Sequence, residues 1–212
     1  MEIEIWSDVM CPFCYIGKRH FEKALEQFAE KDSVRVTWKS YQLDPALKPE
    51  GEQNIYDYLA ERKGISRQQS ETMHERVVRM AEAAGLHYDF DKAIVANSFD
   101  AHRLSHLAAK HGLQDAMEER LFAAYFTEGK NIGDPETLVQ LGAEVGLDEN
   151  EIRGMLRSDA FSAGVKQDAD EAAQLGARGV PFFVIDRKYG ISGAQPVETF
   201  LRALDEAAKT GR

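Results

Sequence analysis

The amino-acid sequence predicts an α/β fold that is interrupted by a large, all-helical insertion. A strand–helix–strand pattern occupies residues 2–43, and a strand–hairpin–helix pattern occupies residues 179–212. Between them, strand patterns are absent for more than a hundred residues and helical patterns follow one another. We therefore expect residues 1–50 and 158–212 to form one α/β domain, and residues 51–157 to form a helical domain inserted into it.

Length and charge narrow the classes of protein that this chain can represent. Its 212 residues suit one large domain or a domain with an insertion, and 43% apolar residues are ordinary for a globular protein. A net charge of −10 argues against nucleic acid as a partner, because phosphate binding needs a basic surface. No apolar run is long enough to span a membrane, and the N-terminus lacks the basic and apolar segments of a signal peptide. We therefore expect a cytoplasmic protein with no membrane partner.

The N-terminal pattern is that of a βαβ unit. Apolar Ile3 and Ile5 alternate with glutamates in the first predicted strand, residues 2–8. An amphipathic helix is predicted from Pro12 to Lys31, and residues 33–43, rich in β-branched and aromatic side chains, predict a second strand. Because a crossover helix joins them, the two strands are expected to be parallel.

The middle of the chain predicts a series of helices, introduced by a loop at residues 44–51. Several helices carry recognisable ends: Asp134 can cap a helix that begins with Pro135, and glycines stand at 64, 85, 112 and 146, where helices would stop. The predicted helices cover residues 55–63, 66–84, 98–111, 114–128, 135–145 and 149–157.

The C-terminal part predicts a helix, a β-hairpin and a final helix. A helix is expected over residues 159–175, and the apolar run 179–186 predicts a buried strand introduced by Pro181. Residues 186–190 predict a hairpin turn, followed by a short partner strand at 191–193. Pro196 then opens an amphipathic helix.

Cys11 and Cys14 are the only two cysteines of the chain, and they lie where the first helix is expected to begin. Side chains at i and i+3 share one face of a helix, which brings two thiols within the range of a disulfide. Free N–H groups and the helix dipole at the N-terminus would stabilise a thiolate on Cys11. Cys14 lies one turn further in and is expected to be less exposed, so Cys11 is expected to attack and Cys14 to resolve. Pro12 fits the first helical position, where its missing N–H group costs nothing.

A structural zinc site and a pair of inert, buried cysteines are the alternative interpretations. Zinc needs four ligands, and the chain has neither a second cysteine pair nor histidines at zinc-finger spacing. His102 and His106 lie at i and i+4 on one predicted helix, but no clear third ligand accompanies them. The strand before the cysteines and the helix after them favour a redox-active pair.

The order of elements, with a Cys-x-x-Cys motif at the first helix and a proline before the third strand, resembles the thioredoxin fold. The helical block resembles that of DsbA-type disulfide oxidoreductases, and within them the FrnE-like branch. The resemblance covers nearly the whole chain. It is carried by the stretches SDVMCPFCYIGK (residues 7–18), NSFDAHRL (97–104), GVPFFV (179–184) and GISGAQP (190–196).

The resemblance implies where a substrate would bind. The peptide bond before Pro181 would be cis, and the main chain of Val180 would pair with an extended substrate beside the cysteines. Pro12 and Phe13 would contact the substrate from the motif itself. Three further contacts are implied in a groove between the helical and thioredoxin-like domains: Asn97, His102 and Arg103.

Other polar and aromatic residues around the motif have plainer interpretations. Lys18, Arg19 and His20 are expected on a solvated face of the first helix, whose axis carries them away from Cys11. Asp8 could accept a proton near the cysteine pair, but an acid in the loop after the first strand is the plainer interpretation. The two tryptophans, Trp6 and Trp38, are expected in the core or in the wall of the groove.

These observations lead to the hypothesis of a protein-disulfide oxidoreductase or isomerase. It would exchange disulfides with protein or small thiol substrates through Cys11 and Cys14, with no bound cofactor. Some FrnE-like proteins carry a second cysteine pair. Because this chain has none, glutathione or a partner protein would have to reduce it.

Two other functions remain open. Kappa-class glutathione transferases and 2-hydroxychromene-2-carboxylate isomerases resemble the chain around the motif, but they carry serine at the place of Cys11 and use glutathione as cofactor. A non-enzymatic, chaperone-like binder would use the groove alone. The presence of both Cys11 and Cys14 favours dithiol exchange.

Overall fold

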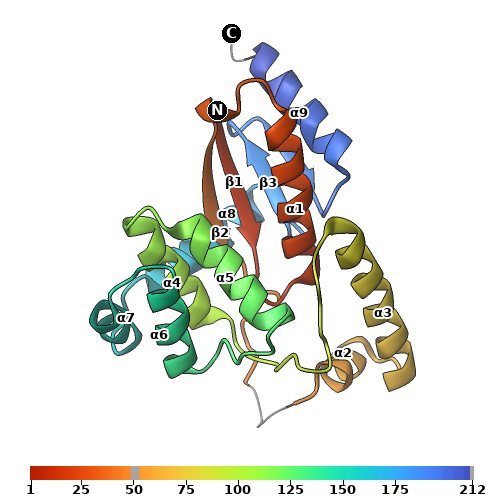
Figure 1. The fold of residues 1–212 in the computed structure, drawn as a ribbon, viewed down its shortest axis with the longest axis vertical. Helices are drawn as coiled ribbons and strands as arrows, with labels where there is room; N and C mark the ends of the chain where they lie inside the picture. The colour runs from red at the N-terminus through yellow and green to blue at the C-terminus, as the bar shows by residue number, and fades with distance from the viewer. Residues whose placement is uncertain (49–52, 211–212) are drawn as a thin grey trace.

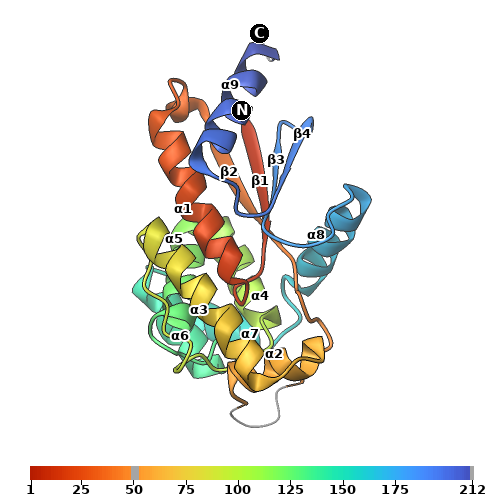
Figure 2. The same ribbon diagram turned by 90° about the vertical axis from the view of Figure 1, so that its right-hand side faces the viewer.

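The computed structural model describes residues 1–48 and 53–210. Within them, a four-stranded mixed sheet carries helices on both of its faces, and a further group of helices gathers at one end of the molecule (Figures 1 and 2). This arrangement confirms the predicted α/β fold with a helical insertion.

The sheet has the order β2-β1-β3-β4. Strand β1 (Glu2–Ser7) pairs in parallel with β2 (Arg35–Ser40), as predicted, and antiparallel with β3 (Phe182–Ile185). Strand β4 (Tyr189–Ser192) pairs antiparallel with β3 and starts before the predicted residue 191. The reason is a tight turn, in which Asp186 and Arg187 both adopt positive φ angles, of 48° and 56°.

Helices cover both faces of this sheet. Helices α1 (Pro12–Gln27) and α9 (Val197–Thr210) pack together on one face, and α8 (Ser162–Gln174) covers the other (Figure 2). Helix α1 is shorter than predicted, because the chain leaves it at Phe28, where an extended backbone allows the ring to be buried. A short 3₁₀ helix over Lys31–Ser33 follows.

The helices between β2 and β3 lie close to their predicted positions, because their ends carry strong local signals. Gly64 and Gly85 adopt left-handed conformations at two C-terminal ends. At four N-terminal ends a side chain accepts an N–H group of the first turn, namely Asn54, Ser66, Asp134 and Asp148. The helices are α2 (Ile55–Lys63), α3 (Arg67–Ala84), α4 (Phe99–Lys110), α5 (Gln114–Phe126), α6 (Pro135–Glu144) and α7 (Glu149–Leu156). Positions 49–51 of the loop predicted at residues 44–51 lie outside the described residues.

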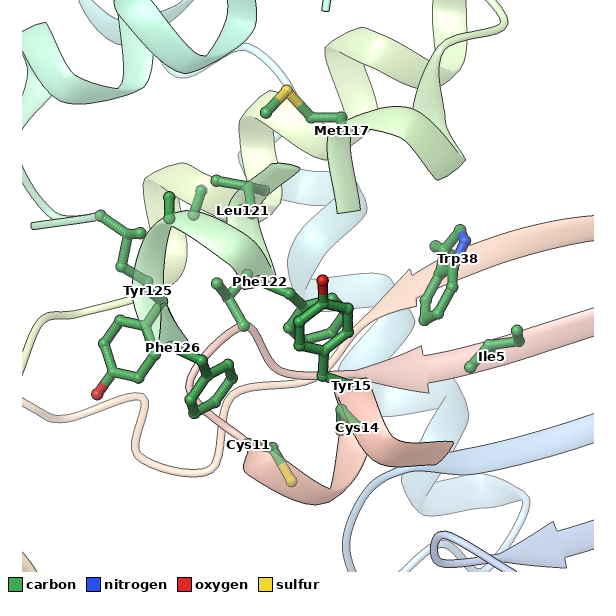
Figure 3. Packing of buried hydrophobic residues seen from close by; sticks show 14 of the residues in the cluster. Ile5, Cys11, Cys14, Tyr15, Trp38, Met117, Leu121, Phe122, Tyr125 and Phe126 are labelled. Atoms are coloured by element: carbon green, nitrogen blue, oxygen red, sulfur yellow. The ribbon is translucent and has the colours of Figure 1, made fainter. Parts of the chain in front are cut away.

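One hydrophobic core connects the sheet to these helices. The core cluster includes Ile3 and Ile5 on β1 as well as Leu104 on α4 and Phe122 on α5. Tyr15 of α1 stacks on Phe122, with ring centroids 4.9 Å apart, where the two parts of the molecule meet (Figure 3). The division into two domains at residues 50/51 and 157/158 stays a prediction.

Both tryptophans are buried and hydrogen-bonded. The Trp6 indole donates to the Asp168 carbonyl over 2.7 Å, and the Trp38 indole donates to Asp115 Oδ1 over 2.9 Å. Each therefore ties the sheet to a helix, Trp6 to α8 and Trp38 to α5. Among the helices of the described residues, none combines the length and apolar character needed to cross a membrane.

Candidate functional site

Cys11 and Cys14 lie at the first turn of α1, and residues 8–10 separate this turn from the end of β1. Cys11 is the N-cap residue of the helix and has an extended backbone, with φ −88° and ψ 110°, and Pro12 follows it at the first helical position. The Cys11 N–H donates to the Asp8 carbonyl over 2.9 Å, and the Cys14 N–H donates to the Cys11 carbonyl over 3.0 Å. Both cysteines are free thiols, and the turn brings them together on one side of the helix.

The two thiols differ more in surroundings than in exposure. Cys11 is 3% exposed and Cys14 is 1% exposed, so the predicted contrast in exposure is small. Cys11 borders a cavity, however, and its Sγ lies 3.5 Å from the Val180 carbonyl oxygen. Burial raises the pKa of the Cys14 thiol well above its ordinary value, and the neighbouring Cys11 sulfur adds to the shift.

The loop before β3 forms the wall opposite Cys11. The Val180–Pro181 peptide bond is cis, as the resemblance implies, and the Pro181 carbonyl accepts the Gly193 N–H over 2.8 Å. On the other side, the Pro181 ring packs directly against α1. A Cβ atom at Gly17 would lie 3.0 Å from Pro181 Cγ, so the missing side chain of Gly17 permits this approach.

A cavity of about 330 Å³ opens beside Cys11. It is bounded by the start of α1, the segment after β2, helices α2 and α3, and residues 179–180 of the loop before β3. Phe13, Leu43 and Met73 line it with partly exposed side chains, which is unusual for large apolar groups and marks a place where an apolar partner can bind. The predicted contacts Pro12, Phe13 and Val180 all line this cavity, and Pro181 stands next to it.

Tyr88 is hydrogen-bonded to the cysteine motif, a role that the sequence does not predict. It is buried, and its hydroxyl donates to the Pro12 carbonyl over 2.7 Å. Burial raises the pKa of Tyr88, and the sulfurs of Cys11 and Cys14 raise it further, so the phenol stays protonated beside them. The ring stacks on Phe126 of α5 at a centroid distance of 4.5 Å. No motif marks Tyr88, because it lies in an irregular segment between α3 and α4.

Asp8 is a buried carboxylate that accepts main-chain N–H groups, rather than a solvated loop acid. Its carboxylate accepts the Leu43 N–H over 2.7 Å and the Met10 N–H over 3.3 Å, and it lies 3.5 Å from Nε2 of His102. Burial alone would raise the pKa of Asp8, but the nearby imidazole of His102 lowers it below its usual value. Burial likewise opposes the charge on His102, but Asp8 raises the pKa of the imidazole above its ordinary value. Asp8 and His102 are therefore a close, buried pair, and each shifts the pKa of the other toward its charged form.

The expectation that Asn97, His102 and Arg103 face one groove is corrected by the structure. His102 is 1% exposed and lies beneath the cavity, against Asp8. Asn97 lines a separate hollow of about 630 Å³ and is held by the Leu47 carbonyl and the Gln42 amide. These positions follow from tertiary contacts, which the local pattern of the sequence does not contain.

The Arg103 side chain, from α4, binds main-chain carbonyls at the C-terminal end of α7. Its buried guanidinium donates to the carbonyls of Met155, Ser158 and Ala160, and it also pairs with Asp100. Carbonyls at the C-terminal end of a helix lack partners within the helix, and a guanidinium offers enough donors for several of them. Arg103 is therefore occupied with chain packing and does not line the cavity beside Cys11.

The prediction of a solvated face for Lys18, Arg19 and His20 is wrong. Lys18 is 2% exposed and forms ion pairs with three carboxylates of α1 and α5, at Glu22, Asp115 and Glu119. The Arg19 guanidinium pairs with Glu119 as well. The His20 ring lies 2.9 Å from the Gln195 carbonyl oxygen. Helix α5 covers the side of α1 that carries Lys18 and Arg19 and brings its own acids, whereas His20 contacts the segment between β4 and α9.

The two histidines of α4 have different partners. His106 Nε2 lies 3.0 Å from Asp168 Oδ2 and 3.1 Å from Ser40 Oγ, whereas His102 faces Asp8. Across residues 1–48 and 53–210, no cluster of three or more His, Cys, Asp or Glu side chains is arranged to hold a metal ion.

Comparisons with known proteins agree with this geometry. A probable DsbA oxidoreductase from Streptomyces coelicolor is 41% identical in sequence, and its crystal structure superimposes with a TM-score of 0.94 over 99% of this chain and 90% of that chain. "Uncharacterized protein YwbO" of Bacillus subtilis (strain 168) is 29% identical over 99% of this chain and 98% of its own.

More distant structures share the fold. A 2-hydroxychromene-2-carboxylate isomerase is 15% identical, with a TM-score of 0.73, and covers 100% of this chain and 98% of its own. The cytosolic disulfide reductase DsbM from Pseudomonas aeruginosa, also solved with glutathione, is 18% identical with a TM-score of 0.68 over 99% of this chain and 100% of its own. A family model described as the DSBA-like thioredoxin domain matches residues 2–205. The chain belongs to the DSBA-like thioredoxin domain family.

Proposed function

We propose that this protein is a thiol–disulfide oxidoreductase or isomerase that works through Cys11 and Cys14. The observation that carries the proposal is the position of Cys11. It stands at the N-terminus of α1, borders a cavity and has Cys14 directly behind it. Thiolates are the attacking species in disulfide exchange, and the cavity gives a substrate disulfide access to the Cys11 sulfur.

The exchange has two steps. The Cys11 thiolate attacks a substrate disulfide, forms a mixed disulfide and releases one substrate thiolate. Cys14 then attacks Cys11 Sγ, its proton passes to the departing thiolate, and the second substrate thiol leaves. The substrate gains two electrons, and the protein is left with a Cys11–Cys14 disulfide; the reverse sequence oxidises a substrate dithiol.

The residues around the cavity position the substrate and the two thiols. The Val180 carbonyl faces the Cys11 sulfur, so an extended peptide could pair with this stretch of main chain. Because Cys14 is buried and its pKa is raised, its thiol stays protonated while the first step takes place. Tyr88 fixes the Pro12 carbonyl and thereby the turn that joins the two thiols.

Membership of the family and the likeness to a probable DsbA oxidoreductase support this function. The FrnE-like branch, the cytoplasmic location and reduction by glutathione or by a partner protein belong to the same proposal. DsbM, which shares the fold, is described as cytosolic, and this is consistent with the cytoplasmic location. The similar fold of the isomerase gives the alternative function no specific observation in this chain, which has cysteine at position 11.

The test compares insulin reduction and reactivation of scrambled ribonuclease by the wild type, Cys11→Ser and Cys14→Ser. We expect Cys11→Ser to lose turnover, whereas Cys14→Ser should accumulate a mixed disulfide on Cys11 that mass spectrometry detects. Glutathione conjugation is measured in parallel. Full disulfide turnover by Cys11→Ser, or conjugation activity that survives in it, would overturn the proposal.

A further inference from the structure

The cavity beside Cys11 has apolar walls and an unpaired polar group among its lining. Leu59, Val77 and Phe90 are among the side chains of its walls, together with the partly exposed groups at the mouth. Tyr125 also lines it and is 1% exposed, yet its hydroxyl has no hydrogen-bond partner in the described part of the chain. Figure 3 shows Tyr125 on α5, beside Phe126 and near the turn that carries Cys11.

A buried hydroxyl without a partner calls for an explanation, because a buried polar group that makes no hydrogen bond costs roughly 1–3 kcal/mol of stability. Burial raises the pKa of Tyr125, so the phenol remains protonated and can both donate and accept a hydrogen bond. A ligand in the cavity that ends in a hydroxyl or amide would supply the missing partner.

The charges around the cavity fit glutathione poorly. Arg62 is committed to Asp44, to the Tyr58 hydroxyl and to the Leu43 carbonyl. Asp8 is held by His102 and by two N–H groups. Burial lowers the pKa of His74, which favours its neutral form.

Among the described charged side chains of the lining, this leaves Lys63 as the one cation without an ion-pair partner. Glutathione carries two carboxylates and an ammonium group, and apolar walls cannot repay their desolvation.

We propose that this cavity binds the apolar arm of a low-molecular-weight thiol or its disulfide, an uncharged arm that ends in a group hydrogen-bonded to Tyr125. At 330 Å³ the cavity lies at the lower end of the range for small-molecule sites. The thiol sulfur would meet Cys11 at the cavity wall, and the arm would lie between α2 and α3. The proposal rests on the exchange reaction proposed above and names its substrate class.

The test follows a single exchange with the fully reduced protein, so that no added reductant is needed. The probes are mixed disulfides of thionitrobenzoate with hydroxyhexanethiol, hexanethiol or glutathione. Cys11 attacks the sulfur of the arm, the arm becomes bound to Cys11, and the coloured thionitrobenzoate anion leaves with the electron pair of the broken bond. Its absorbance gives the second-order rate constant for each arm.

Two substitutions on α3 and one on α5 separate the contribution of the apolar cavity to the rate from that of the Tyr125 hydroxyl. Val77→Trp fills the cavity from α3, and Val78→Trp is the matched control, since Val78 is also partly buried but does not line the cavity. Tyr125→Phe removes only the unpaired hydroxyl. In the wild type, we expect hydroxyhexanethiol to react fastest and glutathione slowest.

Val77→Trp should slow both hexyl probes by about tenfold, because the arm loses its buried apolar contact, and should leave the glutathione probe within about twofold. Tyr125→Phe should remove the advantage of hydroxyhexanethiol over hexanethiol, about three- to tenfold. Equal losses for all three probes, the same losses in Val78→Trp, or an unchanged preference in Tyr125→Phe would overturn the inference; the last would mean that water alone satisfies Tyr125. If no probe releases thionitrobenzoate, the exchange function itself is wrong.

Discussion

At residue scale, the absence of one side chain sets the distance between α1 and the proline loop. Gly17 lies inside α1, where glycine is unfavourable, yet a Cβ there would meet Pro181 Cγ at 3.0 Å and Phe183 Cζ at 3.5 Å. Such a contact is tighter than ordinary van der Waals packing. The loop that carries Val180 would have to move relative to the Cys11 sulfur, which it now approaches to 3.5 Å.

We therefore predict that Gly17→Ala lowers exchange activity several-fold while changing stability little. The gain in helix propensity, about 0.5–1 kcal/mol, should offset much of the packing cost. Gly17→Val should lower both activity and stability, because it adds further atoms against Pro181. Exchange rates and urea unfolding midpoints measure the two effects separately.

Gly154 offers a matched control inside α7. A Cβ at Gly154 would meet nothing within 4 Å. Gly154→Ala should stabilise the protein by about 0.5–1 kcal/mol and leave exchange unchanged. If Gly17→Ala behaves in the same way, the close approach of Pro181 has no part in the reaction.

At the scale of elements, the outer edge of β2 is closed by a side chain. The Trp38 N–H donates to Gln114 Oε1 over 3.1 Å, and Gln114 Nε2 donates to the Trp38 carbonyl over 3.0 Å. The carboxamide thus pairs with both main-chain groups of Trp38, as a neighbouring strand would. Unpaired groups at a sheet edge are open to pairing with other chains, so this contact protects the edge while it attaches α5 to the sheet.

Gln114→Ala should destabilise the fold by about 1–2 kcal/mol, because two partly buried main-chain groups lose their partners. The thiols lie at the other end of the contact between α1 and α5, so the exchange rate should stay near that of the wild type. Urea unfolding of Gln114→Ala is compared with Gln140→Ala, whose side chain only bonds exposed Glu144. Equal midpoints for both variants would show that the Trp38 contact contributes nothing measurable.

Elements could be predicted from the sequence where their signals are local. Helix α6 begins at Pro135 with Asp134 as its cap, and α3 ends before Gly85, because capping groups act within one turn. Helix α1 was predicted too long, since the amphipathic pattern includes Phe28 whether that residue is helical or extended.

The candidate site was predictable to the extent that its residues are adjacent in sequence. The spacing of Cys11 and Cys14 and the proline at 181 mark the reacting centre. Tyr88, Tyr125 and the cavity under α3 were missed, because each depends on a contact between distant segments. The burial of Lys18 was missed for the same reason. The helical pattern predicts on which side of α1 Lys18 lies, but that side is buried only because α5 packs against it.

At the scale of the whole molecule, an ion network joins α1 to α5 behind the cysteine motif. Glu119 of α5 lies between Lys18 and Arg19 and accepts the Tyr15 hydroxyl. Burial alone would raise the pKa of Glu119, but the hydrogen bonds of Arg19 and Tyr15 and the charge of Lys18 lower it to about 2. Together with the aromatic stack of Tyr15 on Phe122, this network holds the two parts of the protein in register.

Because its folded pKa is lowered, Glu119 contributes stability above its ordinary pKa of 4.5, and this contribution is lost as the pH falls toward about 2. The Glu119 side chain is 34% exposed, so we discount the shift for solvent screening and expect Glu119→Gln to cost about 1–2 kcal/mol at neutral pH. The difference from the wild type should shrink by about half near pH 3, because the carboxyl group is then protonated in the unfolded chain, with its ordinary pKa of 4.5, but still ionised in the folded protein. Urea unfolding across the pH range measures it, with Glu136→Gln, which removes an exposed pair with Arg153, as the control. A difference that stays constant with pH would mean that Glu119 acts through packing, and that its charge does not hold α1 on α5.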